Sequence, residues 1–406
     1  MRFQKKKISN GQIITPYRII PGGTVLVEGN RILAVSEYDI PVSDALEIDA
    51  GGRYVAPGFI DIHIHGGGGS DFMDGDVEAF LTVAEKHVQY GTTSMVPTTL
   101  SSDTASLRDA VQLYDKAHAL NKRGSEFLGI HLEGPYFAMN QRGAQDPRYI
   151  RNPDPAEYKA VLESTSSVVR WSAAPELPGS LEFGRYLRSK GILAAIAHTD
   201  AIYEEVLEAL ECGYTHATHL YSAMSGVTRK NAFRYAGAIE SAFLLDEMTV
   251  EIIADGVHLP PPLLKLVYKI KGADKTALIT DAMRAAGMPP GESILGALNN
   301  GLKVIVEDNV AKLPDRSSFA GSVATADQLV RNMVQLADVP LIDAVKMITS
   351  TPAAIMNVAD RKGALVAGKD ADIVIFDADI NMDMVMVGGN LLYQAQHQKQ
   401  LHEAGR

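Results

Sequence analysis

The 406-residue sequence has a single cysteine, Cys212, so it cannot form a disulfide within the chain. Small secreted domains often depend on such bridges, and their absence here favours a reducing compartment. Cys212 lies in a segment of helical pattern, and we interpret it as a small packing side chain rather than a nucleophile.

Long apolar runs are also missing from the sequence. No stretch reaches the roughly 20 apolar residues that a membrane helix needs, and the N-terminus lacks the apolar segment of a signal peptide. We therefore expect a cytoplasmic protein without a membrane partner.

Positive charge is scarce, because 38 lysines and arginines stand against 49 aspartates and glutamates. The formal net charge is −11, with both signs interspersed along the chain. The one dense basic run, residues 5–7, is short, and we interpret it as a solvated strand edge. We therefore expect no nucleic-acid partner.

From residue 54 onward the sequence alternates short apolar runs with longer segments of helical periodicity. Eight apolar runs have strand length and end in polar or glycine-rich residues. They are 54–64, 92–98, 127–133, 168–174, 192–198, 214–220, 249–255 and 276–281. The helical segments are 77–90, 104–120, 156–164, 181–190, 201–211, 262–271, 323–337 and 341–350. This order predicts an α/β fold, a (β/α)8 TIM-like barrel with its active site at the carboxyl ends of the strands.

The two chain ends have another pattern. Segments 11–48 and 363–376 alternate apolar residues with glycine-marked turns, which is typical of antiparallel strands. Neither end is long enough for a core of its own, so we expect both to form one small β-sandwich, from residues 1–54 and 359–406. The metal-dependent barrel, residues 55–358, would be inserted between them, with a β-hairpin over 302–313 after its eighth strand.

Histidines and a carboxylate stand at the ends of several predicted strands. His63 and His65 are two residues apart on the first strand, so they share a face and could bind one metal ion or be ordinary packing. Glu133 ends the third strand, where a buried carboxylate is costly unless it is paired or bound to a cation. His198 and His219 end the fifth and sixth strands. Imidazoles with a carboxylate are expected ligands for Zn²⁺ or a similar ion.

Three further polar residues have predicted roles on these strands. Asp281 ends the eighth strand and could move a proton between water and a leaving nitrogen, with a helix N-cap as the alternative. His131 shares the face of Glu133 and is expected to support the ligands from behind. His216 lies three residues before His219, so we expect it on the opposite face, in a structural role.

Motifs of this chain resemble the amidohydrolase superfamily and, more closely, the N-acetylglucosamine-6-phosphate deacetylases. In order, they are 131–135, 197–201, 218–221, 254–258, 280–282, 319–322 and 368–372. The resemblance covers the barrel and reaches into the C-terminal flank. It implies deacetylation of N-acetylglucosamine 6-phosphate to glucosamine 6-phosphate and acetate, in amino-sugar catabolism.

The resemblance also implies residue roles. Glu133, His198 and His219 would hold the principal metal ion, and Asp281 would be the general acid/base. His258 would contact the acetyl carbonyl, and Phe319 of the 319–322 motif is expected among the substrate-binding residues.

His63 and His65 match the family members that bind a second ion, so one or two ions per subunit are expected. Zn²⁺ is the expected metal, with Fe²⁺ or another divalent ion as the alternative.

Two positions depart from the family pattern. Ser222 and Ala223 stand where the family usually has an Asn-Ala pair that helps to hold the phosphate, and Gln145 replaces a histidine that contacts the sugar. Both changes keep hydrogen-bonding capacity but alter its geometry. The galacto epimer, N-acetylgalactosamine 6-phosphate, is therefore kept as an alternative substrate.

A basic loop between residues 224 and 237 offers a partner for the phosphate. In the family an arginine from this loop reaches the neighbouring subunit's site. The resemblance therefore implies a homodimer in which Arg229 contacts the substrate.

Three other functions were weighed against this prediction. A cyclic-amide hydrolase of the same superfamily typically has a carboxylated lysine at the end of the fourth strand, and segment 172–176 has no lysine. A nucleobase deaminase fits the Glu133 motif poorly. A non-catalytic sugar-phosphate sensor would be expected to lose a ligand or Asp281, and all these positions are filled.

Overall fold

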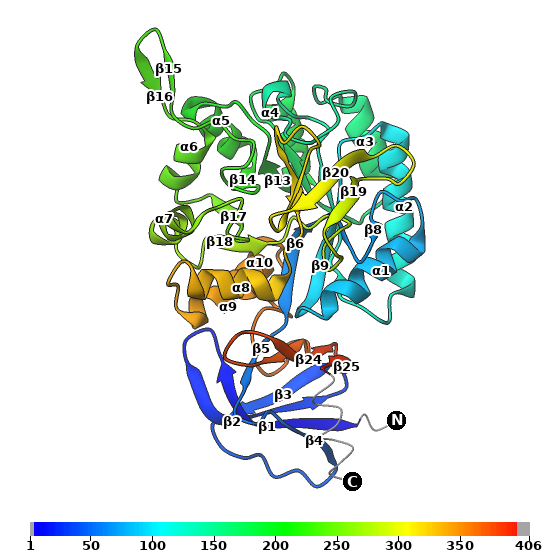
Figure 1. The fold of residues 1–406 in the computed structure, drawn as a ribbon, viewed down its shortest axis with the longest axis vertical. Helices are drawn as coiled ribbons and strands as arrows, with labels where there is room; N and C mark the ends of the chain where they lie inside the picture. Colours follow the sequence, from blue (N-terminus) through cyan, green and yellow to red (C-terminus); the bar gives the residue numbers. More distant parts are fainter. Residues whose placement is uncertain (1–3, 396–406) are drawn as a thin grey trace.

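The computed structural model describes residues 4–395 and has two parts, a helix-covered barrel and a smaller sheet beside it (Figure 1). Eight parallel strands form the barrel, and short β10 (Glu126–Phe127) extends β9. They are β6 (Phe59–Ile64), β9 (Thr92–Thr99), β11 (Ile130–Glu133), β12 (Val168–Ala173), β13 (Leu193–Ile196), β14 (Tyr214–Ala217), β17 (Thr249–Ile253) and β18 (Thr276–Ile279). They pair in this order, and the Asp281 N–H donates to the His63 carbonyl across the remaining seam, at 2.9 Å. The predicted barrel is confirmed.

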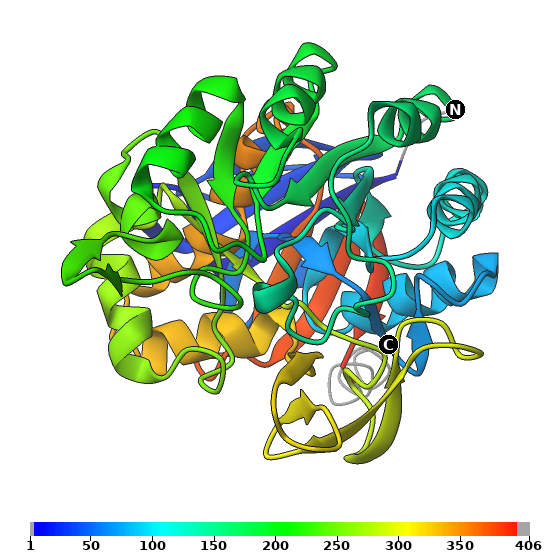
Figure 2. The same ribbon diagram turned by 90° about the horizontal axis from the view of Figure 1, so that it is seen from above.

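Helices surround the strands, as Figure 2 shows from above. They are α1 (Val77–Val88), α2 (Thr104–Leu120), α3 (Pro155–Glu163), α4 (Ser180–Ser189), α5 (Tyr203–Cys212), α6 (Ala238–Leu244), α7 (Pro261–Lys271), α8 (Ala326–Gln335), α9 (Leu341–Ile348) and α10 (Ser350–Ile355). Asp76, Asp103 and Asp154 cap α1, α2 and α3 by accepting backbone N–H groups, as N-cap carboxylates do. Among these helices, α6 and α10 have no counterpart in the sequence prediction.

The first predicted barrel strand, 54–64, is in fact two strands. β5 (Tyr54–Pro57) belongs to the smaller sheet, and only β6 belongs to the barrel. The chain crosses between them at Gly58, whose N–H donates to the Asp372 carbonyl at 2.9 Å. A Cβ at Gly58 would lie 2.1 Å from Thr93 Oγ1, so this crossing requires glycine. An apolar run does not reveal where a chain passes from one sheet to the next.

Both chain ends build the smaller sheet. Its strands are β1 (Lys5–Ile14), β2 (Ile19–Glu28), β3 (Arg31–Ser36), β4 (Ala45–Asp49), β5, β23 (Ile373–Phe376), β24 (Met382–Val387) and β25 (Asn390–Gln394). Hydrogen bonds link them in the order β25-β24-β23-β5-β1-β2-β3, with β4 beside β1. Ile8, Val25, Val55 and Ile375 share its core, so the two ends stabilise each other as predicted. Residues 1–3 and 396–406 of the predicted β-domain lie outside the described range.

Several short strands extend the barrel loops. β19 (Gly291–Leu295), β20 (Leu302–Glu307), β21 (Val310–Lys312) and β22 (Phe319–Ser322) form an antiparallel sheet after β18, and β20 with β21 is the predicted hairpin. β7 (Gly66–Gly67) pairs with β8 (Ser70–Asp71), and Met139–Gln141 is a 3-10 turn. β15 (Thr228–Lys230) and β16 (Phe233–Tyr235) form a hairpin that projects from the barrel (Figure 1). Within residues 4–395, no helix is long and apolar enough to cross a membrane.

Candidate active site

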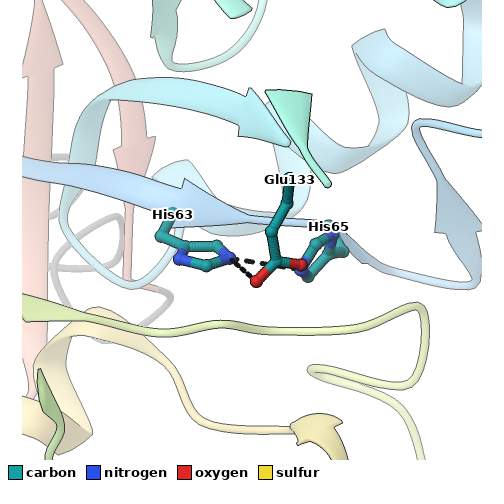
Figure 3. Close-up of side chains that lie close together, drawn as sticks. All are labelled: His63, His65 and Glu133. Carbon is teal, nitrogen blue, oxygen red and sulfur yellow. Dashed lines mark hydrogen bonds and ion pairs between the residues drawn. The ribbon is translucent and has the colours of Figure 1, made fainter. Parts of the chain in front are cut away.

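The five predicted metal ligands converge at the carboxyl ends of the barrel strands. They form two groups that share Glu133, namely His63, His65 and Glu133, and Glu133, His198 and His219. Within each group the ligand atoms lie within 4.8 Å of one another. Figure 3 shows the Glu133 carboxylate between the His63 and His65 rings. A shared carboxylate of this kind can bridge two ions.

The distances around Glu133 fit metal ligands. Its Oε1 lies 3.0 Å from His219 Nε2, 3.4 Å from His198 Nε2 and 3.5 Å from His63 Nε2, and its Oε2 lies 3.4 Å from His65 Nε2. Most of these separations are long for hydrogen bonds. Two ligand atoms that share a tetrahedral ion at about 2.1 Å lie about 3.4 Å apart. The donor set and its spacing therefore fit divalent cations.

Glu133 is charged despite its burial. All five ligands are at most 6% exposed, and burial disfavours a carboxylate anion. The histidines around it, His63 first, outweigh burial and hold the pKa of Glu133 well below its usual range. The Glu133 carboxylate therefore carries a negative charge at the centre of the site, with neutral or cationic imidazoles around it.

Three site residues lie just beyond their strands in left-handed backbone. The φ angles of His198 and Asp281 are 47°, and that of His219 is 30°. Such angles are uncommon outside glycine, and they redirect each side chain toward the barrel mouth. The strand alternation therefore stops before His219, and His216 does not lie on the opposite face. His216 Nε2 lies 3.1 Å from Glu251 Oε2 inside the barrel, which corrects the predicted placement.

Asp281 lies beside the ligands. Its Oδ1 is 3.1 Å from His65 Nε2 and 3.5 Å from His63 Nε2. Burial opposes its charge, but a hydrogen bond from His65 and nearby imidazoles hold the pKa of Asp281 below its usual value. Among the described helices none begins at Asp281, so the N-cap alternative is wrong.

A pocket of about 180 Å³ opens onto this cluster. The predicted substrate residues among its lining are Gln145, Ser222, Ala223, His258 and Phe319. Asp255 Oδ2 accepts a hydrogen bond from His258 Nδ1 at 2.6 Å, which leaves Nε2 free for the pocket. The Phe319 ring packs on His258 with centroids 4.8 Å apart.

Gln145 is bound on both sides of its amide. Its Nε2 donates to Glu133 Oε2 at 2.7 Å, and its Oε1 accepts the Ser101 N–H at 2.8 Å. The residue expected to contact the sugar thus holds a metal ligand as well.

Arg229 does not line this pocket. It lies in β15 of the projecting hairpin and is exposed, as are Lys230 and Arg234. The residues around the pocket include no lysine or arginine. An anionic group bound there would meet no cation from the described part of the same chain.

Sequence reasoning missed Glu251 and Arg170, which lie fully buried below the ligands. Arg170 Nη1 and Nη2 donate to Glu251 Oε2 and Oε1 at 2.6 and 2.8 Å. One signal could have found them, namely a charged residue inside an apolar strand. A charge buried there is stable only when it is paired, so each residue predicts a partner.

Comparisons with known proteins find a matching family and similar chains. The model of the amidohydrolase family matches residues 54–392. The chain is 32% identical to the N-acetylglucosamine-6-phosphate deacetylase of Bacillus subtilis (strain 168) over 96% of its length and 97% of the relative. It is 31% identical to the N-acetylgalactosamine-6-phosphate deacetylase of Escherichia coli O157:H7, over 87% and 90%.

Solved structures of N-acetylglucosamine-6-phosphate deacetylases are also similar. That from Pasteurella multocida has a TM-score of 0.89 at 28% identity, with 95% of this chain and 99% of the other covered. That from Mycobacterium smegmatis has a TM-score of 0.87 at 29% identity, with 96% and 100% covered.

Proposed function

Because the chain belongs to the amidohydrolase family and, within it, to the N-acetylglucosamine-6-phosphate deacetylases, we propose that it deacetylates N-acetylglucosamine 6-phosphate in amino-sugar catabolism. The products are acetate and glucosamine 6-phosphate. The observation that carries this proposal is the convergence of five metal-ligating side chains at one end of the barrel. Four of the five line one pocket together with Asp281 and His258. A phosphorylated sugar is charged and does not cross membranes freely. We therefore propose that the enzyme acts in the cytoplasm, where such a substrate is retained.

Two divalent ions fit the ligands, one on Glu133, His198 and His219 and one on His63, His65 and Glu133. Zn²⁺ suits this mixture of imidazole and carboxylate, and Fe²⁺ is the alternative. Such an ion supplies a Lewis acid for the amide carbonyl and lowers the pKa of water.

The chain's own residues supply the proton transfers. The Asp281 carboxylate accepts the proton of the attacking water and returns it to the leaving nitrogen, so the amine departs neutral. Asp255 orients His258 through Nδ1, which places Nε2 to contact the carbonyl oxygen as negative charge develops there. Gln145, Ser222, Ala223 and Phe319 contact the rest of the substrate.

The phosphate requires a lysine or arginine from elsewhere, since the pocket lining has none. The exposed β15–β16 hairpin carries Arg229, Lys230 and Arg234, and its projection from the barrel lets it reach a second copy (Figure 1). We assign Arg229 to the partner's substrate phosphate, in a homodimer. Arginine is suited to this contact because its planar fork binds two phosphate oxygens.

The deacetylase of N-acetylgalactosamine 6-phosphate is the second candidate. Ser222 and Gln145 depart from the glucosamine pattern, and one relative at 31% identity carries the galacto name. The test is acetate release from three compounds at matched concentrations: the gluco phosphate, the galacto phosphate and the unphosphorylated gluco sugar. We expect the gluco phosphate to have the highest kcat/KM. Equal rates with and without phosphate contradict the phosphate assignment.

The matched variant is Asp281→Asn, which keeps the size of the side chain and removes the base. We expect kcat to fall by about 100-fold or more, the usual contribution of a general acid/base, with the metal still bound. An Asp281→Asn variant that retains most of the activity would contradict the assignment of Asp281 as the general acid/base.

A further inference from the structure

A second layer of buried polar side chains lies directly below the metal ligands. Arg170 on β12, Glu251 on β17 and His216 on β14 are fully buried, and Thr218 follows β14. Charged groups in this position are costly to keep, because each must be desolvated. A buried cluster of this cost is a candidate for a task in the site above it.

Glu251 is the centre of this layer. Arg170 donates to both of its oxygens, at 2.6 and 2.8 Å, and Arg170 Nη2 also donates to Thr218 Oγ1 at 2.8 Å. The His219 N–H donates to Glu251 Oε1 at 3.3 Å, and His216 Nε2 donates to Oε2 at 3.1 Å. The carboxylate is therefore clamped in one orientation.

The remaining partner of Glu251 is the metal ligand His63. His63 Nδ1 lies 2.7 Å from Glu251 Oε1, and a carboxylate only accepts hydrogen bonds, so Nδ1 carries the proton. The unprotonated Nε2 of His63 then faces Glu133 and Asp281, 3.5 Å from each. This is the tautomer and orientation that a metal ion needs.

The other ligand histidines have weaker supports. His65 Nδ1 contacts the Thr98 carbonyl at 3.2 Å, and His198 Nδ1 contacts the Gln141 carbonyl at 2.7 Å. His219 Nδ1 is buried without a hydrogen-bond partner in the described part of the chain. Among the four, only His63 donates from Nδ1 to a carboxylate. A carboxylate partner raises the basicity of a ligand imidazole more than a carbonyl does.

We propose that Glu251, held by Arg170, is a positioning residue for the second metal ion, the one on His63, His65 and Glu133. Glu251 touches neither ion nor substrate. It acts on the His63 side chain through the 2.7 Å contact with Nδ1. Toward the ion on Glu133, His198 and His219 it offers only the longer 3.3 Å bond from the His219 backbone N–H, so we expect this ion to depend on it far less. The proposal rests on the proposed function, because that function implies bound metal. It adds that Glu251 is the buried group that strengthens binding of the second ion.

The test is metal content and metal affinity, measured without substrate. Protein purified without chelators and dialysed should contain two equivalents per chain, and Glu251→Gln should retain one. The dissociation constant of the second ion should rise about 10- to 100-fold, the usual cost of losing a partner of a metal-bound histidine. The constant of the first ion should stay within about twofold.

Two further variants separate positioning from folding. His216→Asn removes another buried partner of Glu251 that touches no ligand, and it should keep both equivalents. The double variant Glu251→Gln with Arg170→Met removes the ion pair together, which avoids an unpaired buried arginine. It should again lose only the second ion. Thermal unfolding of each variant reports whether the fold is retained.

Two results would overturn the proposal. The first is Glu251→Gln binding both ions with unchanged constants, and the second is a parent protein that binds only one ion. Failure of the proposed function looks different, because then the parent releases no acetate while its metal content still responds to Glu251→Gln.

Discussion

Among single residues, Gln145 offers the sharpest test of what the pocket wall does. Its amide bonds both Glu133 and the Ser101 backbone. Gln145→Leu keeps the volume but leaves the buried Ser101 N–H unpaired and removes the hydrogen bond to Glu133 Oε2. We expect the free energy of unfolding to fall by about 1–3 kcal/mol and metal affinity to fall about 10-fold or more. Denaturant unfolding and metal titration measure both.

A purely sugar-contacting Gln145 would behave differently. In that case KM would rise, while metal affinity and stability would stay as in the parent. The two effects are separable, because metal binding is measured without substrate.

His87 predicts how stability changes with pH. It is fully buried in α1, its Nε2 lies 3.0 Å from the Gly66 carbonyl oxygen, and burial lowers its pKa to about 4. An unfolded histidine has a pKa of about 6.5, so between these values the unfolded chain binds more protons and stability falls as pH falls. From pH 7.5 to 5.5 the loss should be about 1 kcal/mol.

The measurement is denaturant unfolding at the two pH values. His87→Gln keeps an N–H donor for Gly66 and should lose this part of the pH dependence. His118→Gln, an exposed substitution on α2, should keep it. Identical pH dependence in both variants would contradict the role of His87.

Local sequence rules located the ligands because they lie at or near the ends of apolar strands, where a buried polar side chain is costly unless it is paired or binds a cation. They missed Glu251 and Arg170 because a charged residue in the middle of an apolar run argues against a buried strand. Only the arrangement of β12 and β17 in the barrel shows that the two charges pair. The contact that makes them stable joins residues 81 positions apart.

Among the elements, the strands were predicted in number and order but not at their ends. β13 ends at Ile196 and β14 at Ala217, before the histidines that follow them. The positive φ angles of His198 and His219 cannot be deduced from an alternating pattern, because tertiary contacts impose them. For this reason the predicted face of His216 was wrong, although the predicted ligands do lie close together.

The β15–β16 hairpin should be removable without loss of the fold. It projects between Gly226 and Gly237, whose backbones are adjacent, since a Cβ on Gly237 would lie 2.5 Å from the Gly226 carbonyl oxygen. Replacing residues 227–236 by Asn-Gly should keep metal content but convert a dimer into a monomer. KM for the phosphorylated substrate should rise at least about 10-fold, because a charged hydrogen bond contributes about 1.5–3 kcal/mol.

Light scattering and steady-state kinetics measure these two effects. Arg229→Ala is the matched control, which should raise KM for the phosphorylated substrate while the dimer persists. Unchanged KM in both variants, or a monomeric parent, would contradict the role of the hairpin.

For the molecule as a whole, the pairing of the two chain ends could be predicted because neither end is long enough to form a core of its own. The direct joint between the ends is the pairing of β5 with β23, and Lys362 adds an ionic contact between the C-terminal end and the barrel. Its ammonium is 1% exposed and lies 2.7 Å from Glu126 of β10 and 2.5 Å from Asp372, beside β23. No local pattern identifies such partners, because the three residues come from separate segments.

Metal removal should separate the fold from the activity. The ligands lie at one end of the barrel, and the apolar core beneath them includes none of them, so a chelated chain should keep its helical circular dichroism. Its melting temperature should fall, because an ion that binds only the folded state stabilises it by about 4 kcal/mol at a thousand times its dissociation constant. Acetate release should cease and return on adding Zn²⁺. Full activity after complete removal of metal would show that the five convergent ligands serve the fold alone.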